Sequence, residues 1–224
     1  WNLPPDDDLE TVQKVMSIFD REARDIGTSV VTGHTGQYAG CSWPTVGAGT
    51  ALAVREHDEI VRPTGASIGD DLIITKGPAI ETVAILAIRF PEKLDLNPEM
   101  IDLAQQRFDE VSPVKDAVIA GSVGASAMHD ATERGIANAL IELADASNVG
   151  LEIERDEIPV GPGVHEVCDA LGIDPMSASS SGSVLITAPN ANPIVDALSA
   201  EGIRASRVGS VVEGGRVHVD GAPL

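Results

Sequence analysis

Two places where a predicted strand passes into a predicted helix carry the side chains best suited to chemistry. The first reads Thr75-Lys76-Gly77-Pro78. A lysine beside the amide groups at the start of a helix can hold a phosphate, but this segment is not the glycine-rich phosphate loop, and Gly-Pro before a helix is also ordinary turn chemistry. The sequence of this segment agrees with both an anion site and a structural turn. Glu81 follows in the first turn of the helix, where we expect a surface acid that compensates the helix dipole.

The second place reads Met128-His129-Asp130-Ala131-Thr132-Glu133-Arg134-Gly135. Asp130 with Glu133 fits a capping box, which would explain both acids without any chemistry. Capping leaves a dense set of polar groups unexplained, namely His129, Thr132 and Arg134. Functional sites collect where buried strands end. A structural cap and a functional site are therefore both open here too.

Other reactive side chains lack the partners that chemistry requires. His34 lies in a loop without a second ligand at metal-binding spacing, so we expect no metal site there. Cys41 and Cys168 are far apart and outside CxxC spacing, which predicts buried thiols rather than a disulfide or a zinc site. No Gly-x-Ser-x-Gly sequence indicates a nucleophilic serine. The run Ser179-Ser180-Ser181-Gly182 has the composition of a flexible turn.

Helices and strands must alternate to position the two junctions. Apolar residues at helical spacing predict helices over residues 9–26, 79–90, 98–111, from 113 onward, 132–146, 164–171 and 193–200. Apolar or β-branched runs predict strands over residues 28–32, 46–54, 72–75, 125–128, 151–154, 183–188 and 205–212. Strands interleaved with helices indicate a sheet covered by helices on at least one face.

A turn-rich segment, Pro63-Thr64-Gly65-Ala66, separates the two parts of the pattern, and we place a domain boundary there. No apolar run approaches the roughly 20 residues that span a bilayer. The first residues have neither a basic nor an apolar signal region. We therefore expect no membrane insertion, no Sec-type secretion and a cytoplasmic location.

The net charge of the chain indicates which partners and which salt environment to expect. The 224 residues carry 35 acidic and 15 basic side chains, a formal net charge of −20. This charge repels phosphate backbones and anionic lipids, and no cluster of Lys and Arg offsets it, so nucleic acid is not expected as a partner. Lysines are few and the acids are spread along the chain, which favours a halophilic protein whose carboxylates are screened by molar salt. An ordinary acidic cytosolic protein is the alternative.

Five segments occur in a characteristic order along the chain: Gly33-His34-Thr35, the runs 69–77 and 128–136, Ile158-Pro159-Val160 and Leu171-Gly172-Ile173-Asp174-Pro175. Through them nearly the whole chain resembles the AIR synthetase superfamily, which includes AIR synthetase (phosphoribosylformylglycinamidine cyclo-ligase), selenophosphate synthetase, thiamine-phosphate kinase and the hydrogenase-maturation carbamoyl dehydratase. It implies an α+β fold. Residues 64–224 would form an AIR-synthetase-like C-terminal domain, a mixed sheet covered by helices. Residues 1–63 would be the C-terminal portion of the N-terminal domain.

The resemblance also implies a site and its cofactors. Members hold ATP with Mg²⁺ in a cleft bordered by both domains, and their N-terminal domains pair in a homodimer. The catalytic residues implied for this chain are Asp130, Thr132 and His34. The cofactor-binding residues implied are Lys76, Gly77, Gly33 and Thr35. The aspartates that usually hold magnesium have no counterpart here, so we assign no metal ligand and expect a fragment or a natural truncation. The strand over 46–54 would then leave an edge able to pair or aggregate.

The nearest resemblance is to the hydrogenase-maturation type and its archaeal relatives, through Asp130-x-Thr132-x-Arg134-Gly135 and Thr75-Lys76-Gly77. That type ends in a modified cysteine, whereas this chain ends Ala222-Pro223-Leu224. We expect an AIR synthase-related, haloarchaeal, ATP-dependent ligase or dehydratase that phosphorylates a small-molecule substrate oxygen. A non-catalytic nucleotide- or metabolite-binding homodimer and a purely structural oligomer partner are the alternatives.

Overall fold

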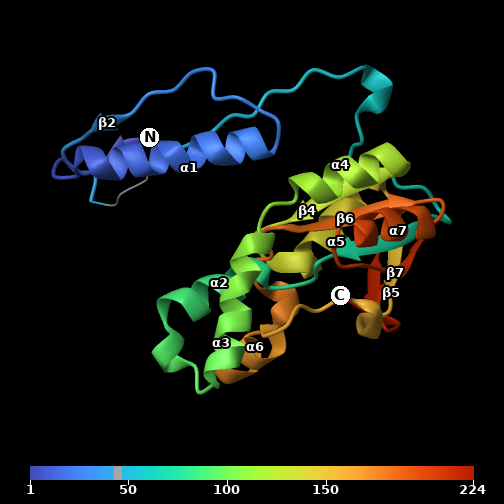
Figure 1. The fold of residues 1–224 in the computed structure, drawn as a ribbon. Coiled ribbons are helices and arrows are strands. Elements are labelled where there is room, and N and C mark those ends of the chain that lie inside the picture. Colours follow the sequence, from blue (N-terminus) through green and yellow to red (C-terminus); the bar gives the residue numbers. More distant parts are fainter. Residues whose placement is uncertain (43–46) are drawn as a thin grey trace. The chain divides into compact units, whose positions relative to one another are not determined.

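A computed structural model describes residues 1–42 and 47–224 and divides into two compact units, Trp1–Glu56 and His57–Leu224 (Figure 1). The boundary predicted at residues 63 and 64 falls a few residues inside the second unit. No helix in the described part of the chain is long and apolar enough to cross a membrane.

The first unit contains one long helix and one short strand pair. Helix α1 spans Leu9–Asp25, and the Asp8 carboxylate caps it by accepting a hydrogen bond from the Thr11 amide at 2.7 Å, as the acidic run predicted. Strands β1 (Asn2–Leu3) and β2 (Gly36–Gln37) pair in parallel. No residue of α1 is buried.

Two strands were predicted in the first unit, and the described residues of both form no strand. Residues 28–32 and 47–54 form irregular chain, and Val46 lies outside the described residues. Their apolar side chains are open to solvent, with Val31 86% exposed and Val54 98% exposed. A β-branched run forms a strand only where a neighbouring strand supplies the ladder, and no pairing of these residues is present.

The second unit is built on a seven-stranded mixed sheet with the order β4-β6-β3-β7-β5-β8-β9. All neighbours are antiparallel except β5 and β8, which are parallel. The strands are β3 (Asp71–Thr75), β4 (Ala127–Ala131), β5 (Gly150–Ile153), β6 (Ser183–Ala188), β7 (Ala205–Val212), β8 (Val217–Val219) and β9 (Ala222–Pro223). The expected α+β fold with a mixed sheet is therefore confirmed. The last two strands were not predicted, because runs this short carry no periodic signal.

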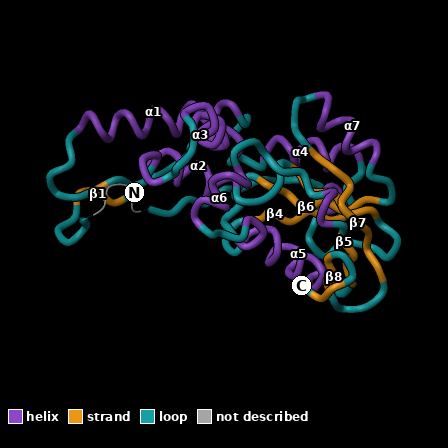
Figure 2. The backbone as a smooth tube through the Cα atoms, turned by 90° about the horizontal axis from the view of Figure 1, so that it is seen from below, coloured by secondary structure: helices purple, strands orange, loops and turns teal. Residues whose placement is uncertain are grey.

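Helices cover both faces of this sheet and one of its ends (Figures 1 and 2). Helix α5 packs on one face, and α4 with α7 packs on the other. Helices α2, α3 and α6 form a separate apolar cluster. The helices are α2 (Ile80–Arg89), α3 (Pro98–Gln105), α4 (Val114–Val123), α5 (Gly135–Ser147), α6 (Val164–Leu171) and α7 (Asn192–Ala200).

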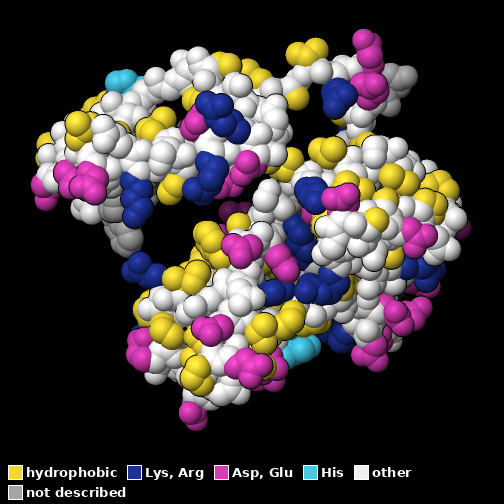
Figure 3. Space-filling view, in the orientation of Figure 1, with side chains coloured by type: hydrophobic (Ala, Val, Ile, Leu, Met, Phe, Trp, Pro, Cys, Tyr) yellow, Lys and Arg dark blue, Asp and Glu magenta, His cyan; other side chains and the backbone are white. Residues whose placement is uncertain are grey.

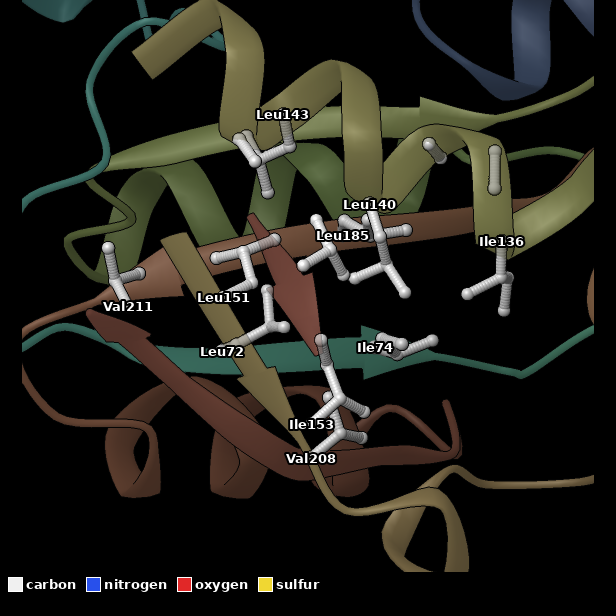
Figure 4. Close-up of a cluster of buried hydrophobic side chains, with 14 of the residues drawn as sticks. Leu72, Ile74, Ile136, Leu140, Leu143, Leu151, Ile153, Leu185, Val208 and Val211 are labelled. Carbon is white, nitrogen blue, oxygen red and sulfur yellow. The ribbon is translucent and has the colours of Figure 1, made fainter. Parts of the chain in front are cut away.

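Side chains of the central strand β3 alternate between two cores. Leu72 and Ile74 belong to the cluster beneath α5, which Figure 4 shows. Ile73 belongs to the cluster beneath α4 and α7. Successive side chains of a strand point to opposite faces, so a strand buried on both sides reads as a continuous apolar run. This is why β3 and β6 were readable from the sequence.

Three predicted elements have different bounds in the structure. The helix predicted over residues 132–146 begins only at Gly135, and the strand predicted over 125–128 runs instead over Ala127–Ala131. The helix predicted over 98–111 ends at Gln105 and continues as a 3₁₀ helix, Gln106–Glu110. Asp130 therefore lies on strand β4 rather than in a helix cap.

Candidate functional site

The segment after β3 is interior to the second unit. Every residue from Thr75 to Ile80 is buried, and Lys76 is only 7% exposed. The backbone of Lys76 has a positive φ of 59°, which is unfavourable for a side chain with a Cβ. Its ammonium forms an ion pair with Asp116 at 3.1 Å. It also donates to three carbonyl oxygens, those of Glu110 (3.1 Å), Ser112 (2.8 Å) and Gly182 (3.1 Å).

This placement differs from the expectation that Lys76 and Gly77 hold a phosphate. An ammonium has three donors, and here they are directed at carbonyls and a carboxylate of the same unit. Two amides of the adjoining helix start are also used: the Ala79 amide donates to the Ser180 hydroxyl and the Thr82 amide to the Ser179 carbonyl. In this structure these donors are used within the unit, and the assignment of Lys76 and Gly77 to a phosphate site stays a prediction.

Gly77 is required by a close backbone approach. Its φ is 100°, and a Cβ built on it would lie 1.7 Å from the Pro159 carbonyl oxygen. No side chain fits between these two backbones. The run Ile158-Pro159-Val160, which carried part of the family resemblance, therefore packs directly on the turn after β3.

The Asp130 motif, residues 130–135, lies at the end of edge strand β4 and is accessible. Asp130 and Arg134 are exposed and Thr132 is half-buried. Arg134 and Gly135 both have positive φ, 62° and 65°. A Cβ on Gly135 would lie 2.4 Å from the Ala178 carbonyl oxygen, so α5 begins in direct backbone contact with residues 176–178.

The capping box predicted for Asp130 and Glu133 is wrong. The residue at the N-cap position of α5 is Arg134, and no side chain caps this helix end. Asp130 is the fourth residue of β4 and pairs across the sheet with Val184. Since capping does not account for Asp130, its exposed carboxylate is available for another role.

His129 links β4 to α5 beside this motif. Its Nδ1 lies 2.6 Å from the Asp130 carbonyl oxygen, and its Nε2 lies 3.4 Å from a Glu142 carboxylate oxygen on α5. Both ring nitrogens therefore face acceptors. The contact holds the end of β4 against the helix that the motif starts.

Residues 179–183, which we call the serine loop, connect the two junctions. The Ser180 amide donates to the Thr132 carbonyl at 3.2 Å, and the Ser183 hydroxyl donates to the Gly77 carbonyl. Ser179 and Ser181 each donate a 2.6 Å hydrogen bond to the same Glu81 carboxylate oxygen. The run does form a turn at Ser181 and Gly182, as its composition indicated, but Ser180 and Gly182 are buried. Glu81 lies in the first turn of α2, as predicted, but it is half-buried and bonded to two serines rather than a simple surface acid. Composition marks a turn but does not tell whether it is buried against other segments.

A second set of charges surrounds Lys76. Arg107 pairs with Glu110 at 2.8 Å, and Arg204 lies 3.9 Å from the same Glu110 oxygen. Arg204 also donates to the Lys76 carbonyl at 3.0 Å. Sequence reasoning missed these residues, because single charges far apart in the chain carry no spacing signal.

Asp71 and Cys168, two residues of the second unit with a shifted pKa, lie outside the Asp130 motif. Burial opposes the ionised form of Asp71, but hydrogen bonds from Arg207 and the Ala191 amide outweigh it and lower the pKa of Asp71. Burial, helped by the charges of Asp169 and Asp174, raises the pKa of Cys168 to about 11. Of the two predicted buried thiols, Cys168 is buried, but Cys41 is only half-buried, so the prediction is wrong for Cys41.

Gly33, His34 and Thr35 lie in an exposed loop of the first unit. The His34 ring contacts the Tyr38 hydroxyl at 2.8 Å, and its carbonyl accepts a hydrogen bond from the N-terminal amine at 2.7 Å. Their assignment to the site stays a prediction.

The fold and the motif define an α+β protein with polar groups gathered where an edge strand meets a helix. The family model for the C-terminal domain of AIR synthase related proteins matches residues 67–221, more than half of the chain. The chain therefore belongs to the AIR synthase-related family, which confirms the resemblance drawn from its motifs.

Relatives of the hydrogenase-maturation type align along nearly the whole chain. The carbamoyl dehydratase HypE of Rhizobium leguminosarum bv. viciae is 31% identical over 214 residues, which are 92% of this chain and 58% of that protein. The crystal structure of Escherichia coli HypE aligns with a TM-score of 0.78 and 24% identity over 100% of this chain and 70% of that chain. A HypE structure in complex with ATP aligns with a TM-score of 0.72 and 20% identity, with the same coverage. These structural matches show the fold. The chain spans a little over half of the Rhizobium relative, 58%, so they do not establish that protein's activity here.

Proposed function

We propose that this chain is part of an ATP-dependent enzyme of the hydrogenase-maturation type, in which ATP phosphorylates a substrate oxygen and a nucleophile then displaces phosphate. The observation that carries the proposal is the exposed polar surface of the Asp130 motif, held on constrained backbone between β4 and α5. Phosphoryl transfer depends mainly on positioning and charge neutralisation. The 31% identity to HypE and the ATP complex of a similarly folded HypE support this choice.

The roles follow from exposure and chemistry. Arg134 presents a guanidinium suited to a phosphate oxygen, and the Thr132 hydroxyl can donate to one. Asp130 presents a carboxylate that can orient or deprotonate an attacking group. Lys76 and Gly77 act indirectly: their contacts with Gly182 and Ser183 hold the serine loop in position. We assign Gly33, His34 and Thr35 to the nucleotide side of the site on the family resemblance alone.

The residues present fit the phosphates of ATP better than they fit a resident magnesium ion. A guanidinium and a hydroxyl on a constrained helix start are suitable donors for phosphate oxygens. Within residues 1–42 and 47–224, no group of three or more His, Cys, Asp and Glu side chains is arranged to hold a metal. No step of this proposal therefore passes through a metal ion held by these residues. ATP would supply the transferable phosphoryl group.

Calorimetric titration of ATP into the chain in molar KCl tests the binding surface. Arg134→Gln and Thr132→Ala are expected to weaken ATP binding by about tenfold, because each removes a donor to a charged ligand. Arg155→Gln is the control, since Arg155 is an exposed arginine that pairs with Asp220 in another part of the unit. Equal affinities in all four proteins would contradict the site.

Phosphate release separates an enzyme from a nucleotide-binding module. Asp130→Asn should leave ATP affinity within about threefold of wild type while lowering phosphate release by about 100-fold, a size typical of a lost acid or base. ATP binding without any release by the wild-type chain would favour the non-catalytic alternative.

A further inference from the structure

The serine loop is hydrogen-bonded to the start of α2 and to the segment that leads into α5. On the α2 side, the Thr82 hydroxyl and amide both donate to the Ser179 carbonyl, and the Ala79 amide donates to the Ser180 hydroxyl. On the α5 side, the Ser180 amide donates to the Thr132 carbonyl. Neighbouring residues of one loop therefore hold both junctions.

Glu81 supplies the charge in this arrangement. One oxygen of its carboxylate accepts hydrogen bonds from Ser179 and Ser181, at 2.6 Å each. Hydrogen bonds to an ionised acceptor are about twice as strong as neutral ones. Two hydroxyls two residues apart that meet at one oxygen fix the curvature of the loop between them. That curvature sets the position of the Ser180 amide.

The serine loop and the Asp130 motif are in such close backbone contact that neither can shift without the other. The Thr132 carbonyl accepts hydrogen bonds from both Ser180 and Gly135, and Gly135 touches the backbone of Ala178 too closely to admit a Cβ. A displacement of the loop must therefore move the segment that carries Thr132. Packed backbones transmit such shifts instead of absorbing them.

We propose that Glu81 is a positioning residue for the site: its carboxylate holds the serine loop, and the loop holds Thr132 and Arg134 in place. This inference rests on the proposed function for its consequence in ATP binding, but its structural part is independent of any ligand. Glu81 itself need not contact the nucleotide.

Amide hydrogen exchange of the whole 224-residue chain tests the structural part. We compare Glu81→Ala, Glu81→Gln and Glu99→Ala. Glu99 is a matched control because it is also the second residue of a helix, α3, and is exposed. In Glu81→Ala, exchange over residues 130–136 should rise by about tenfold while exchange in β7 stays unchanged, since local opening affects only the contacts that are lost. Glu81→Gln should restore protection, because its amide oxygen can accept both hydroxyls. Unchanged exchange over 130–136 in Glu81→Ala would overturn the inference.

ATP affinity then tests the consequence. Affinity should fall by about tenfold in Glu81→Ala and stay near wild type in Glu81→Gln and Glu99→Ala. A purely structural role would lower thermal stability in Glu81→Ala without this loss of affinity, and that result would overturn the positioning role. If wild type binds no ATP, the proposed function fails, while the exchange comparison still decides whether Glu81 holds the motif.

Discussion

Lys76 offers the sharpest test of how this unit is held together. Lys76→Met keeps the length of the side chain but removes its charge and its donors. Asp116, 1% exposed, would then retain only the hydroxyl hydrogen bond from Thr75 at 2.7 Å. Removing one partner of a buried ion pair costs about 3–5 kcal/mol, because the other charge stays buried without compensation. The carbonyl oxygens of Glu110, Ser112 and Gly182 would also lose their donor.

We therefore expect Lys76→Met to lower the free energy of unfolding by about 4 kcal/mol. Asp116→Asn in the same chain should recover part of this loss, since it removes the uncompensated charge and keeps an acceptor for Thr75. Lys93→Met is the control: Lys93 is exposed and its ammonium lies 4.5 Å above the Phe90 ring, a contact worth about 0.5–1 kcal/mol.

A second pair of variants isolates the strained backbone. Lys76→Ala and Lys76→Gly both lose the ammonium, but only Ala keeps a Cβ at the φ of 59°. Lys76→Gly should be more stable than Lys76→Ala by about 1 kcal/mol.

Urea denaturation in molar KCl, followed by far-ultraviolet circular dichroism, measures these differences. Circular dichroism is used because it reports on the helices of the second unit, whereas both tryptophans, Trp1 and Trp43, precede residue 57. If Lys76→Met costs no more than Lys93→Met, the ion pair and carbonyl contacts do not stabilise the unit as argued.

Further expectations concern salt, assembly and pH. Acidic side chains are spread over the visible surface (Figure 3), so the melting temperature should rise from low to molar KCl; a melting temperature independent of salt would count against the halophilic interpretation. We expect a homodimer by sedimentation at molar salt, and a monomer at high protein concentration would remove this expectation. Asp71, whose pKa is lowered by Arg207, stabilises the fold above its unfolded-state pKa of about 3.9, and this contribution is lost as pH falls through its lower folded-state pKa. Asp71→Asn should therefore be less stable at neutral pH and lose less stability on acidification in denaturant titrations; parallel pH profiles for the two proteins would refute the linkage.

A local apolar pattern alone was enough to predict some buried elements from the sequence. Helix α6 and strands β6 and β7 have the predicted bounds, because each carries a complete apolar period within its own length. The start of α5 was misplaced because the Asp130–Glu133 spacing satisfies a capping rule that the positive φ of Arg134 and Gly135 overrides. That backbone is fixed by contact with residues 176–178, which no local window contains.

The same limit explains why the partners of Lys76 and Glu81 could not be predicted from the sequence. Exposure is the default for both residue types, and their side chains differ from that default only because distant segments supply partners: three carbonyls and Asp116 for Lys76, two serines for Glu81. A motif thus marks candidate residues but not the partners that the fold gives them. In this structure Lys76 and Glu81 are bonded within the unit, whereas Asp130 and Arg134 are exposed and Thr132 is half-buried. Experiments on the reaction should therefore begin at the Asp130 motif, and experiments on Lys76 should begin with stability.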